Sequence, residues 1–379
     1  MAYRIPLSFP VFEGNEKLYS EQAISSGHLA TYGAFIDKFE TKLAKKIKSH
    51  EAVALNSGTS ALHLAMVLLG IGPGDEVICQ SFTFCASANP IVYLGAKPIF
   101  VDSETDTWNI SPELLEDAIL SRIAVGKKPK AIVLVHLFGM PAKIKEVMEI
   151  SQKYQIPVIE DAAEAVGSKV DGQSCGTFGT IGVYSFNGNK IITSGGGGAL
   201  LSNDTEIIQR AIHLSTQARE DLPYYQHLEI GYNYKMNNLS AAVGLAQLEQ
   251  LDTLVEKRRK INAAYREIFS RFDGFTFQEE LEDSWSNYWL TTVLIDEEKA
   301  GISNDKIRVL LMREGIETRF LWKPLHLQPV FREMPFYGGN ISEKLFNSGL
   351  CLPSSVNLEY SELEEIAYLI EKEISKSYH

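Results

Sequence analysis

The feature of this sequence that most constrains its fold is a repeated alternation of strand-like and helix-like segments between Glu51 and Leu201. The run AVAL is followed by NSGTSALHLAMVLLG, DEVICQ by a polar turn and CASANPIVYLG, and KAIVLVHL by AKIKEVMEISQKYQ. Such alternation predicts βαβ units and a mostly parallel sheet with helices on both faces. Ligands of such sheets bind at the carboxyl ends of the strands.

The rest of the chain predicts a second, smaller domain. NNLSAAVGLAQLEQLDTLVEKRRKINAAYREIF has apolar residues at helical spacing over an unusual length, which indicates one long helix, or two with a kink, leaving the sheet domain. Beyond it, NYWLTTVLID, NDKIRVLLMREG, IETRF and SELEEIAYLIEKEI alternate strand and helix. We expect a large domain over residues 1–250 and a small α/β domain over residues 251–379, with an N-terminal arm of about residues 1–15 packed on the small domain.

Composition and charge argue against several classes of function. The 379 residues carry a net charge of −12, so no basic field would attract a nucleic acid. The opening MAYRIPLSFPVFEG lacks the apolar core of a signal peptide, and LHLAMVLLGIG is too short to span a bilayer, so we expect a cytoplasmic protein without a membrane partner. The four cysteines and eight histidines show no CxxC or HExxH spacing, so neither a disulfide framework nor a metal site is indicated.

Three segments place chemically capable residues at the ends of predicted strands. In LNSGTSALHLA, Gly58 permits a tight turn and Thr59 or Ser60 can cap the following helix, which would form an anion site typical for phosphate. An ordinary cap that binds nothing is the alternative. In PVIEDAAEAVG, a buried strand delivers Asp161 to its carboxyl end, either as a helix cap or as a partner for a cationic ligand atom.

The third segment is SFNGNKIITSGGGG, in which Lys190 follows the predicted strand GVYSF, 29 residues after Asp161. A lysine amine is a nucleophile only when it is deprotonated, which desolvation or a nearby cation favours. A surface lysine in a flexible loop is the alternative. Pyridoxal phosphate is one ligand that needs all three features, because its phosphate, pyridine nitrogen and aldehyde require an anion site, an acid and a lysine.

The sequence resembles the DegT/DnrJ family of nucleotide-sugar aminotransferases, built on the fold type I aminotransferase plan. The resemblance runs nearly end to end, through NSGTSALHLA, GDEVICQSFTFCASANPI, GAKPIFVD, IEDAAEAVGS, GTFGTIGVYSFNGNKIITSGGGG, IGYNYKMNNLSAA and FLWKPLH. The match to SFNGNK is closest to the branch that aminates the 4-keto carbon of a UDP-linked 6-deoxy sugar, such as UDP-4-keto-6-deoxy-N-acetylglucosamine.

The resemblance implies roles for individual positions around the cofactor. Lys190 matches the Schiff-base lysine, and Asp161 the partner of the pyridine nitrogen. Phe84 matches an aromatic residue that stacks on the cofactor, although it could be a core residue. Glu164 falls where relatives carry Glu or His near the cofactor or sugar; one helical turn from Asp161, it could equally be an exposed glutamate.

The remaining positions concern the phosphate and the substrate. Gly58, Thr59 and Ser185 match phosphate-site positions. Asn233 resembles the residue that reaches across a homodimer interface to the neighbouring subunit's phosphate, with a plain turn asparagine as the alternative. Arg219 and His326 are candidate substrate contacts, although surface packing would explain them as well.

The resemblance implies a ping-pong transamination from L-glutamate to a sugar ketone, with Lys190 as general base and acid. Ser194 and Gly196 depart from the Thr and Glu of many relatives, and the second change removes a carboxylate near the site. A dehydrating branch has His at the lysine position, so Lys190 favours transamination. The alternatives are a 3-keto-sugar aminotransferase, a GDP-sugar 4-aminotransferase, an amino-acid lyase, and a non-catalytic regulatory protein that binds pyridoxal phosphate.

Overall fold

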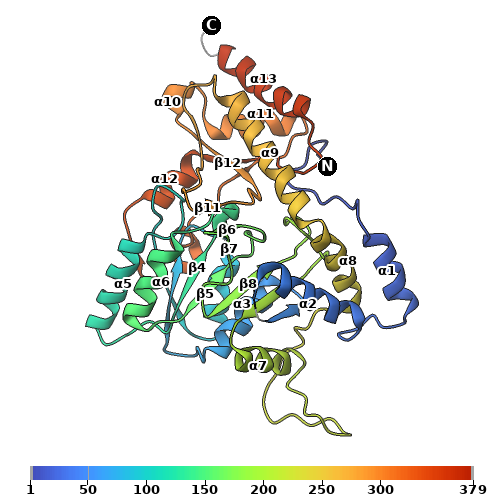
Figure 1. The fold of residues 1–379 in the computed structure, drawn as a ribbon. Helices are drawn as coiled ribbons and strands as arrows, with labels where there is room; N and C mark the ends of the chain where they lie inside the picture. Colours follow the sequence, from blue (N-terminus) through green and yellow to red (C-terminus); the bar gives the residue numbers. More distant parts are fainter. Residues whose placement is uncertain (1–2, 50, 377–379) are drawn as a thin grey trace.

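The computed structural model describes residues 3–49 and 51–376, which form a larger lower part and a smaller upper part in Figure 1. The larger part is built on an eight-stranded sheet. Its strands, in spatial order, are β1 (Glu51–Leu55), β9 (Gly198–Ser202), β8 (Ile181–Ser185), β5 (Val158–Asp161), β4 (Ala131–Val135), β2 (Glu76–Gln80), β3 (Lys97–Val101) and β14 (Phe336–Tyr337).

The sheet is parallel except at β9, which pairs antiparallel with both β1 and β8. Its last strand, β14, comes from the C-terminal part of the chain and pairs parallel with β3. The expectation of a mostly parallel α/β sheet is confirmed. Because β8, β5, β4 and β2 are parallel, the segments after them emerge along one edge.

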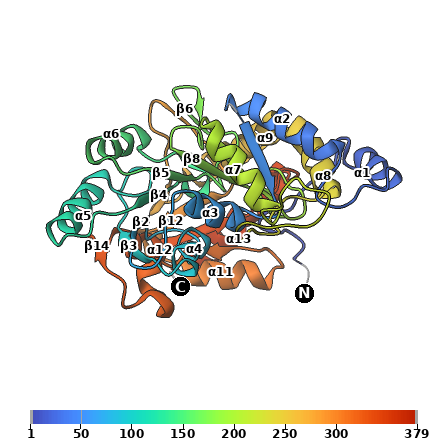
Figure 2. The same ribbon diagram turned by 90° about the horizontal axis from the view of Figure 1, so that it is seen from below.

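Helices cover both faces of this sheet (Figure 2). One core lies between the sheet and α2 (Ala34–Ile47), α5 (Pro112–Ala124), α6 (Ile144–Tyr154) and α8 (Asn238–Glu249). The other core lies under α3 (Gly58–Leu68), α4 (Asn89–Tyr93) and α7 (Thr205–Ser215). Helix α1 (Glu16–Ser25) packs against α8. Strands β2, β4, β5, β8 and β9 are buried along their whole length, which is consistent with their continuous apolar runs.

The long helical segment is two helices, because α8 ends at Glu249 and α9 (Leu251–Phe269) begins after Gln250. Helix α9 leads into the smaller part (Figure 1), whose four-stranded sheet runs β10 (Phe275–Phe277), β12 (Thr291–Ile295), β15 (Gly349–Leu352), β13 (Arg319–Phe320). Its helices are α10 (Glu297–Ala300), α11 (Asn304–Arg313), α12 (Ile341–Ser348) and α13 (Tyr360–Lys376). A third sheet joins β11 (Ser284–Trp285), β6 (Lys169–Val170) and β7 (Gln173–Ser174).

The N-terminal segment contacts the smaller part. Ile5 is buried in the same core as Ile261 and Ile366, and Arg4 pairs with Glu365. Within the described ranges, no helix combines the length and the apolar character needed to cross a bilayer.

Candidate active site

A cavity of about 470 Å³ lies where the segments after β1, β2, β5 and β8 meet. Parallel strands carry residues that are distant in sequence to the same edge, which explains why these segments converge. Among the residues that line the cavity are seven that the sequence predicted: Gly58, Thr59, Phe84, Asp161, Glu164, Ser185 and Lys190.

The start of α3 forms one wall of the cavity. Its N-cap is Ser57, whose hydroxyl accepts a hydrogen bond from the Ser60 N–H at 3.0 Å, so the expectation of a cap at Thr59 or Ser60 is wrong. Thr59 is therefore left to face the cavity. A Cβ on Gly58 would lie 3.0 Å from the Cβ of Ser185, so glycine allows the end of β8 to approach this helix start. The free N–H groups at the start of α3, beside the hydroxyls of Thr59 and Ser185, form a site that suits a phosphate.

The run of glycines after Lys190 also shapes this wall. Gly195 has a φ of +80°, which favours glycine. A Cβ on Gly198 would lie 2.5 Å from the backbone carbon of Ser57, closer than real Cβ atoms come. The glycine therefore lets β9 pack directly against the start of α3.

Asp161 ends β5 and is almost fully buried. Its Oδ2 accepts a hydrogen bond from the Ser87 hydroxyl at 2.7 Å, and its Oδ1 accepts one from the Ala163 N–H at 3.2 Å. No helix begins at this turn, which excludes the helix-cap alternative. Burial raises the pKa of Asp161, while the Ser87 hydrogen bond, the Ala163 N–H and the charge of Lys190 oppose the rise. The carboxylate can accept a hydrogen bond from a protonated ligand nitrogen in the cavity.

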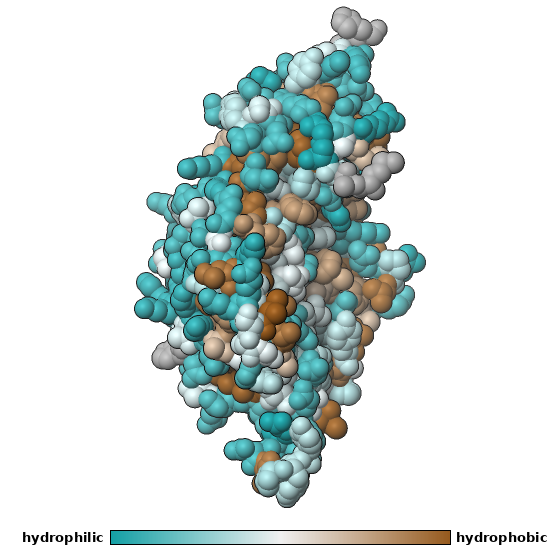
Figure 3. Space-filling model, turned by 90° about the vertical axis from the view of Figure 1, so that its right-hand side faces the viewer, coloured by the Kyte–Doolittle hydropathy of each residue, from teal (hydrophilic) through white to brown (hydrophobic). Residues whose placement is uncertain are grey.

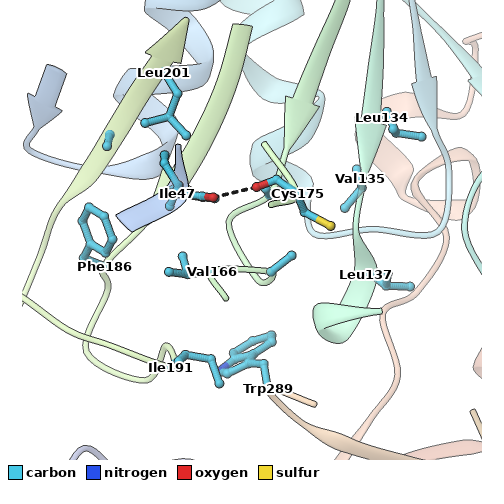
Figure 4. Packing of buried hydrophobic residues seen from close by; sticks show 14 of the residues in the cluster. Ile47, Leu134, Val135, Leu137, Val166, Cys175, Phe186, Ile191, Leu201 and Trp289 are labelled. Atoms are coloured by element: carbon cyan, nitrogen blue, oxygen red, sulfur yellow. Dashed lines mark hydrogen bonds between the residues drawn. The ribbon is translucent and has the colours of Figure 1, made fainter. Parts of the chain in front are cut away.

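Lys190 points into the cavity, and only 14% of its side chain is exposed, which excludes the surface-loop alternative. Its Nζ lies 3.5 Å from Glu164 Oε1 and 3.8 Å from the centroid of the Trp289 ring. Trp289 belongs to the buried core together with Ile191 and Val166 (Figure 4), and its indole N–H donates to the Asn189 carbonyl at 2.7 Å. The amine is thus held between a fixed ring and a carboxylate.

Glu164 is buried, so it is not an ordinary exposed glutamate. It lies in a turn rather than one helical turn after Asp161. Its Oε2 accepts a hydrogen bond from the Phe138 N–H at 2.6 Å, and Phe138 itself has a φ of +57°. Burial raises the pKa of Glu164, and the Lys190 charge and the Phe138 N–H oppose this. Glu164 is therefore oriented toward the lysine amine by the loop after β4.

Phe84 is 49% exposed, so the alternative of a core residue is wrong. Its ring lies at the cavity wall, 5.2 Å from the ring of Trp322, which in turn stacks on Phe138 at 6.2 Å. An exposed aromatic face on a cavity wall can cover a flat ligand ring.

Three predicted residues are not among those that line the cavity. Arg219 and Asn233 belong to the long loop after α7, in which bridges join Thr216 to Asn233 and Arg219 to His227. This loop extends from the bottom of the molecule in Figure 1. His326 is half-buried; its Nδ1 lies 2.7 Å from Ser81 Oγ, and its ring stacks on Phe336 at 3.7 Å.

Sequence reasoning missed several residues of the site. Trp289 and Arg319 line the cavity from the C-terminal third of the chain, and Ser87 binds Asp161 from 74 residues away. Ser87 lies within the stretch GDEVICQSFTFCASANPI, but no local pattern distinguishes it from a helix-capping serine. Trp322, which lies in the stretch FLWKPLH, also lines the cavity.

The described residues fit pyridoxal phosphate. Ser57 to Thr59 and Ser185 would hold its phosphate, Asp161 its pyridine nitrogen and Phe84 one face of its ring, with Lys190 at the aldehyde. The buried carboxylate supports this fit, because a protonated ring nitrogen would offset the cost of burying the Asp161 charge, beyond what the Ser87 and Ala163 hydrogen bonds supply.

Comparison with known proteins agrees with this chemistry. Residues 11–371 match the DegT/DnrJ/EryC1/StrS aminotransferase family. The chain is 47% identical over 96% of its length to EpsN of Bacillus subtilis (strain 168), named as a pyridoxal phosphate-dependent aminotransferase, and covers 94% of that protein. It is 38% identical to the GDP-perosamine synthase of Escherichia coli O157:H7, with 97% of each chain covered.

Among solved structures, the pyridoxal phosphate form of Spr1654 from Streptococcus pneumoniae, named as a sugar aminotransferase, superposes with a TM-score of 0.90 at 26% identity, covering 99% of this chain and all of the other. The fold, the family match and the convergence of Lys190 with Asp161 agree with one another. The chain belongs to the DegT/DnrJ/EryC1/StrS aminotransferase family and is a pyridoxal phosphate-dependent aminotransferase.

Proposed function

We propose that this enzyme transfers an amino group from L-glutamate to the C4 ketone of a nucleotide-linked 4-keto-6-deoxy sugar. The favoured substrate is UDP-4-keto-6-deoxy-N-acetylglucosamine, which would give UDP-4-amino-4,6-dideoxy-N-acetylglucosamine for bacterial glycan biosynthesis. The observation that carries the proposal is the meeting of Lys190, Asp161 and the start of α3 in one cavity. The sequence SFNGNK supports the choice of sugar.

A GDP-linked 4-keto sugar is the second candidate substrate. It is favoured by the 38% and 37% identity to proteins named GDP-perosamine synthase in Escherichia coli O157:H7 and Vibrio cholerae. Both candidates share the same chemistry at the ketone and differ in the nucleotide, so a direct comparison of the two substrates decides between them.

The chemistry divides between the cofactor and the chain. Bound pyridoxal phosphate supplies an electron sink that stabilises negative charge at the substrate carbon. Lys190 Nζ takes the proton from the donor α-carbon and returns a proton in the opposite half-reaction, as general base and acid. Glu164, 3.5 Å from that amine, orients it between transfers. Asp161 keeps the pyridine nitrogen protonated.

The amino donor L-glutamate and the nucleotide-linked sugar are both anions. To bind them, the cavity needs positive charge that offsets its two carboxylates. Asp161 and Glu164 line it, whereas Lys190 and Arg319 are the lining residues with positively charged side chains among the parts of the chain described. Arg319 is exposed, and Glu317 accepts its hydrogen bonds at 3.1 and 2.8 Å, which holds the guanidinium at the cavity. We assign to Arg319 the binding of a substrate carboxylate or phosphate.

We further propose a homodimer with shared active sites. The loop after α7 exposes large apolar side chains, at residues Leu222, Tyr224, Tyr225, Leu228 and Ile230. Apolar side chains also lie exposed on the side of the molecule that carries α1 and α8 (Figure 3). Apolar surface of this kind favours a protein partner. A second copy would cover it and would bring Asn233, which is exposed and does not line the cavity of its own chain, to the neighbouring phosphate site.

The test is an assay with L-glutamate and purified keto sugars. The enzyme should aminate the UDP-linked 4-keto-6-deoxy sugar faster than its GDP-linked counterpart and faster than a 3-keto isomer. A preference for the GDP-linked sugar would transfer the proposal to the second candidate. The sugar assignment would be refuted if the enzyme turned over none of the keto sugars although it still accepted the amino group of L-glutamate in the first half-reaction.

A further inference from the structure

Two buried hydroxyls lie next to the carboxylate of Asp161, in residues that line the same cavity, and have no role in the chemistry described so far. Ser87, at the end of a short 3-10 helix (Cys85–Ser87), is 1% exposed, and Thr83 is 3% exposed. Ser87 Oγ lies 2.7 Å from Asp161 Oδ2, and Thr83 Oγ1 lies 3.0 Å from Ser87 Oγ. The three side chains therefore form a continuous chain of hydrogen bonds that ends at the carboxylate.

The direction of these hydrogen bonds follows from the number of hydrogens available. An ionised carboxylate only accepts, so the single hydroxyl hydrogen of Ser87 is donated to Asp161. Thr83 must then be the donor in its contact with Ser87. Each donation polarises the next hydroxyl, and a hydrogen bond to a charged acceptor is stronger than a neutral one. The chain therefore favours the ionised, correctly oriented form of Asp161.

We propose that Ser87 is a positioning residue which, with Thr83 behind it, holds Asp161 so that its remaining lone pairs face the ring nitrogen of bound pyridoxal phosphate. This inference rests on the proposed placement of Asp161 at that nitrogen. The geometry supports it, because the Ser87 hydroxyl donates to Oδ2 and the Ala163 N–H donates to Oδ1, and the carboxylate that they hold lines the cavity beside them. The same turn carries Phe84, so one segment would set both the ring face and the carboxylate.

The hydrogen bond from Ser87 is important because some other neighbours of Asp161 destabilise its ionised form. Lys190 and His136 lower the pKa of Asp161, but burial is the largest influence and raises it. Glu164 is a second buried acid close enough for the two charges to repel, and Cys79 also lies near Asp161. Loss of the Ser87 hydrogen bond would therefore raise the pKa of Asp161 further.

The experiment titrates the visible absorption of the bound cofactor against pH in the purified holoenzyme. In Ser87→Ala, Asp161 should stabilise the protonated ring nitrogen less well. The Schiff-base nitrogen between Lys190 and the cofactor then becomes more basic. The pH at the midpoint of the absorption change should therefore rise by at least about half a pH unit. Ser87→Thr keeps the hydroxyl and should restore the wild-type midpoint. Ser342→Ala is a matched control, because Ser342 is fully buried and its hydroxyl has no hydrogen-bond partner among the described residues.

A midpoint in Ser87→Ala equal to that of the wild type overturns the proposal, and so does an equal shift in Ser87→Ala and Ser87→Thr, which would indicate a packing effect. If Ser87→Ala does not fold, Thr83→Val removes only the hydroxyl that donates to Ser87. A smaller upward shift of the midpoint then supports the proposal, and no shift overturns it.

Asp161→Asn separates the placement of Asp161 at the ring nitrogen from the role of Ser87. If it leaves the midpoint unchanged, Asp161 does not face the ring nitrogen and both proposals fail; if it shifts the midpoint and Ser87→Ala does not, only the role of Ser87 fails.

Discussion

Gly198 makes a sharp structural demand on the proposed phosphate site, and Gly198→Ala tests it. The added Cβ would lie 2.5 Å from both the carbonyl carbon and the oxygen of Ser57 and 2.6 Å from the nitrogen of Gly58. These distances fall about 0.9 Å short of ordinary van der Waals contact at 3.4 Å. All three atoms belong to the backbone, so no side chain can rotate away and the start of α3 must move.

Overpacking of this kind costs about 1–3 kcal/mol, and we expect the upper end because the backbone must yield. Since 1.4 kcal/mol corresponds to a tenfold change in affinity, a displaced helix start should weaken pyridoxal phosphate binding by roughly 100-fold. Fluorescence titration of the apoprotein with the cofactor measures this, alongside the free energy of unfolding of the apoprotein.

Gly72→Ala is the control, because nothing lies within 4 Å of its added Cβ and Gly72 does not line the cavity. It should change stability by no more than about 0.5 kcal/mol and affinity by about threefold at most. If Gly198→Ala binds the cofactor and unfolds like the wild type, the close approach of β9 to α3 is not what shapes the phosphate site.

Other substitutions test the remaining roles. Asp161→Asn should lower transamination by at least about a hundredfold, yet its apoprotein should be at least as stable as the wild type at neutral pH. The reason is that burial raises the pKa of Asp161, so its ionised form destabilises the folded protein above that pKa. The gain in free energy of unfolding from Asn should vanish as the pH falls below the ordinary pKa range of an aspartate. Denaturation measured as a function of pH would show this. Arg319→Ala should raise the KM of at least one anionic substrate roughly tenfold or more with little change in kcat, and unchanged KM values for both substrates would remove its role. Coexpressed Lys190→Ala and Asn233→Ala chains should form mixed dimers with activity that neither variant has alone; inactivity of the mixture would contradict a shared site.

The residues of the site that could be predicted from the sequence are those whose position depends on a single strand and the segment directly after it. Asp161 follows a run of buried residues and Lys190 follows another, so their place at the edge of a parallel sheet could be anticipated. The start of α3 was also recognisable, although the cap is Ser57 rather than Thr59 or Ser60. Several hydroxyl residues in a row can each cap a helix, and local sequence does not choose among them.

The contacts that could not be predicted join segments far apart in the chain. Trp289 meets Lys190 because the smaller part of the molecule packs onto the larger one, and Ser87 meets Asp161 because β2 and β5 lie in the same sheet. The sequence left open whether α8 and α9 form one helix or two with a kink, and it could not place the break at Gln250, since helical spacing continues through it. Such features follow from tertiary packing rather than from local propensity.

Reductive trapping of the cofactor tests the central claim most directly. Borohydride would be added to the holoenzyme, and the protein would then be digested and its peptides mapped by mass spectrometry. The account predicts a stable pyridoxyl group on Lys190 and none in Lys190→Ala. A modified lysine elsewhere in the chain, or no modification in protein saturated with pyridoxal phosphate, would contradict it.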